Sequence, residues 1–105
     1  MVIVDLGMAA KTRPAVVVSV PGVPPERNMS VVVPLTTEIR GGPSEVPFQK
    51  PPWLMSRSVA NVMGLGGVDN AKIIRRVGQF PAMAAMEAAI KRVLGLEHTT
   101  GQTAS

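Results

Sequence analysis

Three short runs of mostly β-branched residues constrain the fold of this chain more than any other feature. They occupy residues 2–4, 15–20 and 30–35, and Gly, Pro and Asn residues punctuate the intervals between them. Their apolar residues are continuous rather than alternating, which indicates strands buried on both faces. The proline-rich connection at 21–28 favours a surface loop between two antiparallel strands. The runs therefore predict a small β-barrel that is closed or nearly closed.

The middle of the chain predicts further strands. Residues 44–48 suit an edge strand, because Pro47 has no amide hydrogen to donate to a neighbour. Residues 58–62 and 75–80 predict two more strands. Between them lie three glycines that predict a turn or a bulge, namely Gly64, Gly66 and Gly67.

The spacing of apolar residues changes at Pro81. From there, large apolar side chains recur at intervals that place them on one face of a helix, and we expect the helix to pack by this face: Met83, Met86, Ile90, Val93 and Leu94. Pro81 suits the first helical turn and Gly95 suits the end. The predicted fold class is therefore mainly β with a C-terminal α-helix.

The length and composition predict a single intracellular domain. The 105 residues, 46% of them hydrophobic, suit one modest core, which we place at residues 1–96. Residues 97–105 are small and polar, so we expect a flexible tail. The chain has no cysteine and no apolar run long enough to cross a bilayer, which favours a cytoplasmic protein. His98 is the only histidine, so we predict no metal site and no cofactor.

The charge of the chain permits a nucleic-acid partner without requiring one. Eleven Lys and Arg residues against seven Asp and Glu residues give a net charge of +4, which attracts a polyanion only weakly. One Trp, two Phe and no Tyr are too few aromatic rings for a module that binds single strands by stacking. A stacking-type RNA-binding module is therefore disfavoured.

Two blocks combine an apolar strand with polar residues at its end. RPAVVVS at 13–19 places Arg13 at the entrance of a strand, and VVVPLTT at 31–37 places Thr36 and Thr37 at the exit of another. A planar guanidinium and a nearby hydroxyl stabilise the negative charge that develops on a five-coordinate phosphorus. Because arginine stays protonated at ordinary pH, we assign Arg13 to charge stabilisation rather than to proton removal.

The proton acceptor for such a reaction is not evident in the sequence. Asp5 and Glu45 are the acids in the blocks nearest these strands, and either could serve if it points into the site. We expect each of them to be a solvated or structural carboxylate. The glycine pair after Arg40 suggests an anion-binding turn, but no Walker lysine and no following helix accompany it, so a flexible loop is the preferred interpretation.

The order of the blocks resembles that of the MazF/PemK family. The matching segments are VDL at 4–6, the two blocks above, EV at 45–46, a Gly-rich stretch, RRVG at 75–78, and a terminal helix that ends in LGL at 94–96. Together they cover nearly the whole chain up to residue 96. The resemblance implies a homodimeric SH3-like barrel of the MazF/CcdB type. It also implies a toxin of a type II toxin–antitoxin pair, silenced by a cognate antitoxin.

The resemblance further implies a metal-independent endoribonuclease that cleaves single-stranded RNA at a short sequence. In that reaction the ribose 2′-hydroxyl attacks the adjacent phosphorus and leaves a 2′,3′-cyclic phosphate and a 5′-hydroxyl. Arg13 and Thr36 match the catalytic arginine and threonine of the family. We predict RNA contacts for four further residues: Thr37, Arg40, Arg75 and Lys11. Of the neighbours Arg75 and Arg76, only one can face the RNA, because successive side chains of a strand point to opposite faces.

The chain departs from the family at two positions. Met63 stands where many members carry an acidic residue, and Gly66 stands where a second basic residue is common. Two alternatives therefore stay open. One is a non-enzymatic gyrase inhibitor of the CcdB type, which shares the barrel, and the other is a catalytically impaired member that only binds antitoxin.

Overall fold

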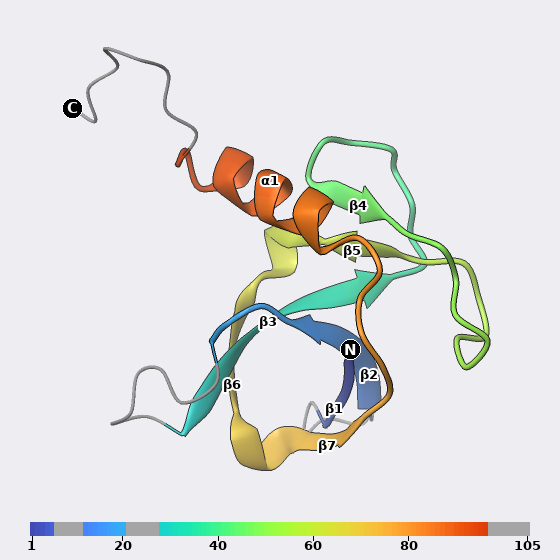
Figure 1. Ribbon diagram of the computed structural model, residues 1–105, viewed down its shortest axis with the longest axis vertical. Coiled ribbons are helices and arrows are strands. Elements are labelled where there is room, and N and C mark those ends of the chain that lie inside the picture. Colours follow the sequence, from blue (N-terminus) through green and yellow to red (C-terminus); the bar gives the residue numbers. More distant parts are fainter. Residues whose placement is uncertain (6–11, 21–27, 97–105) are drawn as a thin grey trace.

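The computed structural model of the chain describes residues 1–5, 12–20 and 28–96 (Figure 1). Its strands, in chain order, are β1 (Val2–Asp5), β2 (Thr12–Val17), β3 (Met29–Thr36), β4 (Glu45–Pro47), β5 (Val59–Asn61), β6 (Gly66–Asp69) and β7 (Ile73–Arg76). The short 3-10 helices η1 (Val62–Gly64) and η2 (Asn70–Lys72) lie on either side of β6, and α1 (Met83–Val93) follows β7. The mainly β fold with a C-terminal helix confirms the predicted fold class. The predicted tail at 97–105 lies outside the described residues.

All strand pairs in the sheet are antiparallel, and β3 is its centre. The strand order is β4-β5-β3-β2-β1-β7, with β6 paired separately to β3. In Figure 1, β3, β2, β1, β7 and β6 follow one another around a ring. Among the described residues no strand ladder joins β6 to β7, so the barrel is nearly closed.

The central strands are buried on both faces, against two separate apolar clusters. Ala15 and Val32 lie in the cluster enclosed by the ring, whereas their chain neighbours Val16 and Val33 lie in a larger cluster that includes residues of α1. Successive side chains of a strand point to opposite faces, so a strand between two cores needs apolar residues at every position. This arrangement confirms the prediction drawn from the continuous apolar runs.

Helix α1 covers the larger cluster with a face that differs in part from the predicted one. Met86 and Ala89 are buried, and Ile90 and Val93 pack against the same cluster. Leu94, predicted to share this face, is 55% exposed. The helix ends at Val93, and Gly95 adopts a φ of 70°, a left-handed conformation that suits glycine at a helix end. Leu94 therefore follows the last helical residue and leaves the packed face.

The structure corrects the predicted bounds of two strands, β2 and β7. Strand β2 spans Thr12–Val17 rather than residues 15–20, because β1 pairs with it as far as Asp5 opposite Thr12. Arg13 thus lies within a strand instead of at its entrance. Strand β7 ends at Arg76 rather than residue 80, because its partner β1 begins at Val2, which lies opposite Arg76.

The glycine-rich segment was the third error. The predicted turn or bulge at residues 64–67 is instead the end of η1 followed by the start of β6, in which Gly66 pairs with Val32 and Gly67 with Val31. A Cβ on Gly67 would lie 3.3 Å from Cε of Met29, so these strands approach closely where glycine is present. The sequence gives no alternation there, which is why the strand was missed.

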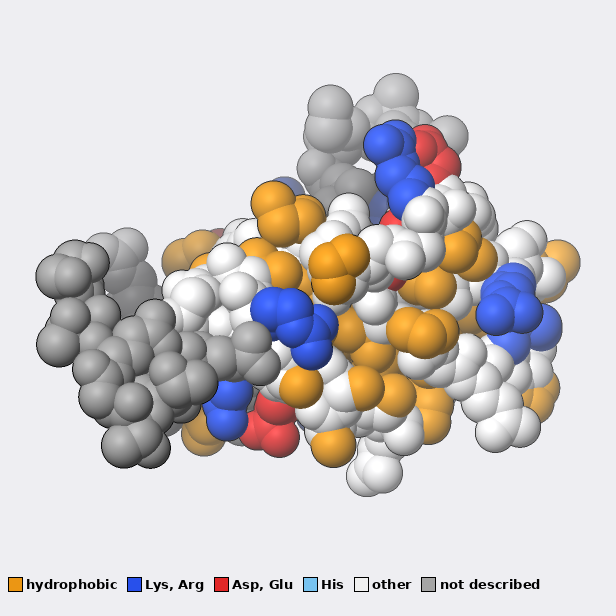
Figure 2. Space-filling view, turned by 90° about the horizontal axis from the view of Figure 1, so that it is seen from above, with side chains coloured by type: hydrophobic (Ala, Val, Ile, Leu, Met, Phe, Trp, Pro, Cys, Tyr) orange, Lys and Arg blue, Asp and Glu red, His pale blue; other side chains and the backbone are white. Residues whose placement is uncertain are grey.

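Figure 2 shows the face of the molecule that carries α1. Apolar side chains spread over its middle, while Lys and Arg side chains stand apart from one another. The described residues of this face therefore form no continuous basic surface that would hold a polyanion by charge alone. Within the described residues, no helix has the length and apolar character needed to cross a membrane.

Candidate functional site

A groove of about 890 Å³ runs along the β1–β2–β3 face of the ring. Strands β1, β2, β3, β6 and β7 contribute to it, and residues 53–58 and the start of the loop after β3 complete the wall. Four residues predicted for the site line this groove: Arg13, Thr36, Thr37 and Arg75. The groove thus brings together groups that lie up to 62 positions apart in the chain, from Arg13 to Arg75.

The register of β2 and β3 explains how Arg13 and Thr36 reach the same groove. The last pair of their ladder joins Ala15 to Pro34. Carried two residues further, this register places Arg13 at the position that corresponds to Thr36. Residues two apart in a strand share a face, so both side chains lie on the face of Ala15 and Pro34, which also line the groove.

The ladder does not continue between these two residues. Beyond Pro34, β3 pairs with β5 instead, where Thr36 lies opposite Val59, and Arg13 lies opposite Val4 of β1. The strands therefore separate next to the two candidate catalytic residues. Arg13 is exposed and Thr36 is half-buried, so both are accessible to a ligand in the groove.

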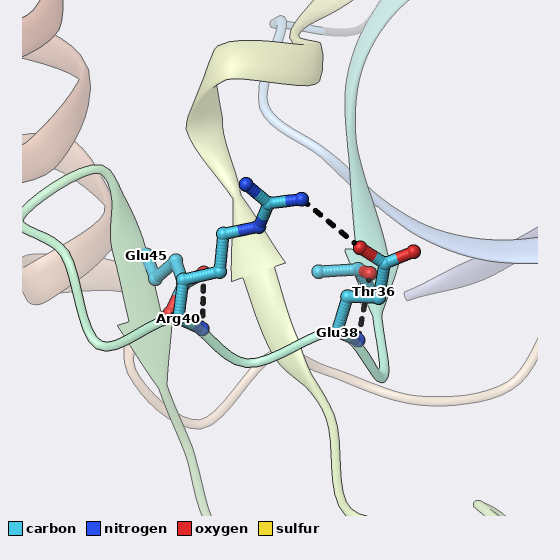
Figure 3. Close-up of polar contacts among 4 residues, drawn as sticks. All are labelled: Thr36, Glu38, Arg40 and Glu45. Atoms are coloured by element: carbon cyan, nitrogen blue, oxygen red, sulfur yellow. Dashed lines mark hydrogen bonds and ion pairs between the residues drawn. The ribbon is translucent and has the colours of Figure 1, made fainter.

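The loop after β3 fixes the Thr36 hydroxyl. The backbone N–H of Glu38 donates a hydrogen bond of 3.0 Å to Oγ1 of Thr36 (Figure 3). Because this bond uses an acceptor lone pair, the hydroxyl hydrogen remains available to a ligand. The Glu38 carboxylate accepts a charge-assisted hydrogen bond of 3.2 Å from Nη2 of Arg40, so three residues of one loop form a connected set.

Glu45 holds the same loop from the other side. Its carboxylate oxygens accept hydrogen bonds of 2.9 and 3.1 Å from the backbone N–H of Arg40 (Figure 3). They also accept one of 2.7 Å from the backbone N–H of Gly41. Glu45 thus occupies the anion-binding turn considered in the sequence. The structural role expected for this carboxylate is confirmed, and it does not line the groove.

Strand β7 sends its two arginines to different cavities. Arg75 lines the groove, whereas Arg76 lines a second cavity of about 500 Å³ near Met1. The alternation of strand side chains predicted this separation. Burial, and secondarily the Arg76 charge, lower the pKa of the Met1 ammonium below its usual value of 8.0. That ammonium donates a hydrogen bond to the carbonyl oxygen of Gly78.

Other predicted positions lie elsewhere. Arg40 does not line the groove, and its guanidinium pairs with Glu38 as described. Lys11 lies outside the described residues. Met63 is 69% exposed on η1 and is not part of the groove wall, whereas Gly66 is.

Two groove residues were not predicted for the site. Trp53 packs against the larger core and also lines the groove. Glu38 lines the groove as a carboxylate two residues after Thr36. The sequence could have indicated Glu38, because it directly follows the paired threonines. Thr and Ser hydroxyls at strand ends often accept a hydrogen bond from the backbone two residues on, which holds that residue near the hydroxyl.

The family match and the similar solved structures both point to MazF-like toxins. Residues 1–94 match the family described as PemK-like, MazF-like toxin of type II toxin-antitoxin system. No curated protein matches the chain.

Three solved structures illustrate the likeness. The Mycobacterium tuberculosis toxin MazF-mt6 is 26% identical, covers 92% of this chain and 97% of its own, and superposes with a TM-score of 0.78. An endoribonuclease in complex with its cognate antitoxin, from a mycobacterial species, is 24% identical with a TM-score of 0.77, and 93% of each chain is covered. A MazE–MazF complex from Deinococcus radiodurans is 22% identical with a TM-score of 0.72, and covers 90% of this chain and 89% of its own. Because the family match spans residues 1–94, this chain belongs to the PemK-like, MazF-like toxins of type II toxin–antitoxin systems.

Proposed function

We propose that this toxin is a metal-independent endoribonuclease that cleaves single-stranded RNA at a short recognition sequence. The observation that carries the proposal is the meeting of Arg13, Thr36 and Arg75 in one accessible groove. A groove that exposes two guanidinium groups and a fixed hydroxyl suits a phosphodiester better than a neutral ligand.

In this proposal the 2′-hydroxyl oxygen attacks the adjacent phosphorus. Negative charge then builds up on the non-bridging oxygens, where Arg13 donates two parallel hydrogen bonds and Thr36 donates one. These contacts strengthen as the charge grows, so they stabilise the transition state more than the bound substrate. The P–O5′ bond breaks, and the products are a 2′,3′-cyclic phosphate and a 5′-hydroxyl.

The remaining groove residues have binding roles in this proposal. Thr37 and Arg75 contact the RNA backbone next to the scissile phosphate, and Trp53 offers an aromatic face for one base. Arg40, which does not line the groove, and Lys11 are proposed to add phosphate contacts. Sequence selectivity is assigned to the wall at residues 53–58, because it presents both apolar and hydroxyl side chains to the groove and base edges are read by hydrogen bonds and apolar contacts.

The assembly is also part of the proposal. Solved MazE–MazF and endoribonuclease–antitoxin complexes support a cognate antitoxin as the partner of this chain. We propose a cytoplasmic homodimer that this antitoxin silences. Exposed apolar side chains such as Met55, at 94%, and Leu96, at 52%, are available for such contacts.

The test is cleavage of a labelled single-stranded RNA of mixed sequence in the presence of EDTA. We expect cuts at few sites, with cyclic-phosphate and 5′-hydroxyl ends. Arg13→Ala and Thr36→Val should each lower kcat by about 10²-fold or more, since each removes a donor to the developing charge. Matched controls are Lys91→Ala on α1 and Thr12→Val, which do not line the groove.

The same assay separates the alternatives. Intact RNA together with inhibition of DNA supercoiling by gyrase would support the CcdB-type alternative and contradict our proposal. Intact RNA with unaltered antitoxin binding would indicate an impaired member.

A further inference from the structure

The proposed reaction needs a group that takes the proton from the attacking 2′-hydroxyl. Neither a protonated arginine nor a threonine hydroxyl is a ready acceptor. Met63 cannot supply a carboxylate, and Asp5 and Glu45 do not line the groove. Among the groove-lining residues in the described part of the chain, the one carboxylate is that of Glu38. We propose that Glu38 is the general base of this site, an assignment that rests on the proposed endoribonuclease function.

Its position relative to the other catalytic groups is fixed by the backbone. The backbone N–H of Glu38 donates a hydrogen bond of 3.0 Å to Oγ1 of Thr36, so the residue that carries the carboxylate lies next to the hydroxyl that contacts the phosphate (Figure 3). Arg13 shares the strand face of Thr36 in the same groove. A phosphate bound between Arg13 and Thr36 therefore brings its 2′-hydroxyl next to this loop.

The orientation of the carboxylate is set by Arg40. Nη2 of Arg40 contacts Oε2 of Glu38 at 3.2 Å, and the backbone of Arg40 is held in turn by both carboxylate oxygens of Glu45. The ion pair is exposed, with 81% and 78% of the two side chains accessible, so it contributes little to stability. The ion pair occupies Oε2 of Glu38. In the proposed geometry, Oε1 of Glu38 is the atom that accepts the proton.

The proton and electron pairs balance in the step. The O2′–H bond breaks, its proton goes to Oε1 of Glu38, and its electron pair forms the O2′–P bond. The P–O5′ pair leaves with O5′, which takes a proton from water, and Glu38 then returns its proton to the hydroxide so formed. No metal or redox partner is required.

The charged residues that accompany Glu38 are mostly basic. Arg40 contacts its carboxylate directly, and Arg13 and Arg75 line the same groove. Glu45, at the start of β4, directs its oxygens to the backbone N–H groups of residues 40 and 41.

The test compares Glu38→Gln with Glu38→Asp, Arg40→Gln and the control Glu87→Gln on the exposed face of α1. Glutamine keeps the size of the side chain and the backbone N–H to Thr36 but cannot accept the proton. The substrate is an oligonucleotide with a single ribonucleotide, placed at a cut site mapped on the mixed-sequence RNA. The readouts are kcat, KM and the pH dependence of kcat/KM.

We expect Glu38→Gln to lower kcat by about 10²- to 10⁴-fold with little change in KM, and to abolish the acidic limb of the pH profile. Glu38→Asp should recover part of the rate, and Glu87→Gln should match the wild type. A kcat for Glu38→Gln within about threefold of wild type, or an unchanged acidic limb, would overturn the assignment.

The Arg40 variant distinguishes a base from a residue that acts through its ion pair. Arg40→Gln removes the pair and leaves the carboxylate, so its kcat should fall far less than that of Glu38→Gln. Equal falls would mean that Glu38 only orders the loop, which also overturns the assignment. A wild-type protein that cleaves no RNA would instead refute the proposed function, and the base assignment with it.

Discussion

Gly64 gives a sharp test of how the groove is packed, because a single methyl group there meets a rigid neighbour. A Cβ built on Gly64 would lie 2.6 Å from Cγ and 3.2 Å from Cδ of Pro34, where ordinary contacts are 3.4–4 Å. The pyrrolidine ring cannot rotate out of the way, since it is closed on the backbone. Pro34 itself pairs with Ala15 in the sheet. Either η1 or β3 must therefore move in Gly64→Ala.

The size of the effect follows from two opposing terms. Overpacking of this kind costs about 1–3 kcal/mol, while loss of glycine entropy in the unfolded chain returns about 0.4–1 kcal/mol. We expect the free energy of unfolding of Gly64→Ala to fall by about 1–2 kcal/mol. In a domain of this size each kcal/mol shifts Tm by about 4–8 °C. Urea unfolding at a fixed protein concentration measures the change, since stability of a dimer would depend on concentration.

Two other glycines serve as controls that distinguish the steric contact at Gly64 from the effect of backbone conformation. Gly42 has no atom within 4 Å of an added Cβ and no positive φ, so Gly42→Ala should leave stability unchanged or raise it slightly. Gly41 also has open space but a φ of 79°, so Gly41→Ala should cost about 1 kcal/mol through strain alone. If Gly64→Ala proved as stable as Gly42→Ala, the close approach of η1 to Pro34 would be refuted.

Three further outcomes are expected. Met86→Ala should lower the free energy of unfolding by about 2–5 kcal/mol, because Met86 is fully buried on the packed face of α1. Met83→Ala, at a residue that is 39% exposed, should cost clearly less in the same urea assay. Glu45→Gln should lower the free energy of unfolding by about 1 kcal/mol, since it weakens three charge-assisted hydrogen bonds to the backbone N–H groups of Arg40 and Gly41. The control Glu87→Gln should have no effect, and equal values for the two variants would contradict a stabilising role for these bonds. The free energy of unfolding should rise with pH up to about pH 8.0 and then level off, because the folded chain releases the Met1 ammonium proton at a lower pH than the unfolded chain. Urea midpoints measured across this pH range should show the rise. Acetylation of the amine should remove it.

Much of the fold could be predicted from local patterns. Continuous β-branched runs indicated strands between two cores, and Val16, Val33 and their neighbours confirm it. The change of apolar period at Pro81 indicated the helix. The errors lay where pairing, rather than composition, sets the structure: β2 and β7 extend as far as their partner β1 allows, and β6 forms from glycines because β3 supplies the ladder.

The candidate site divides in the same way. Arg13, Thr36 and Arg75 were identifiable from residue type, order and family resemblance, because a guanidinium or hydroxyl group next to an apolar run can be read directly from the sequence. That Glu38 shares their groove, while Glu45 turns to the backbone and Met63 to solvent, depends on loop geometry and on the register between β2 and β3. The sequence by itself determined which chemical groups the chain possesses and where the helix and most of the strands lie, because apolar periodicity depends on neighbours in the chain. Only the tertiary structure decided which groups face one another, because strand register and side-chain direction are set by contacts between residues far apart in sequence.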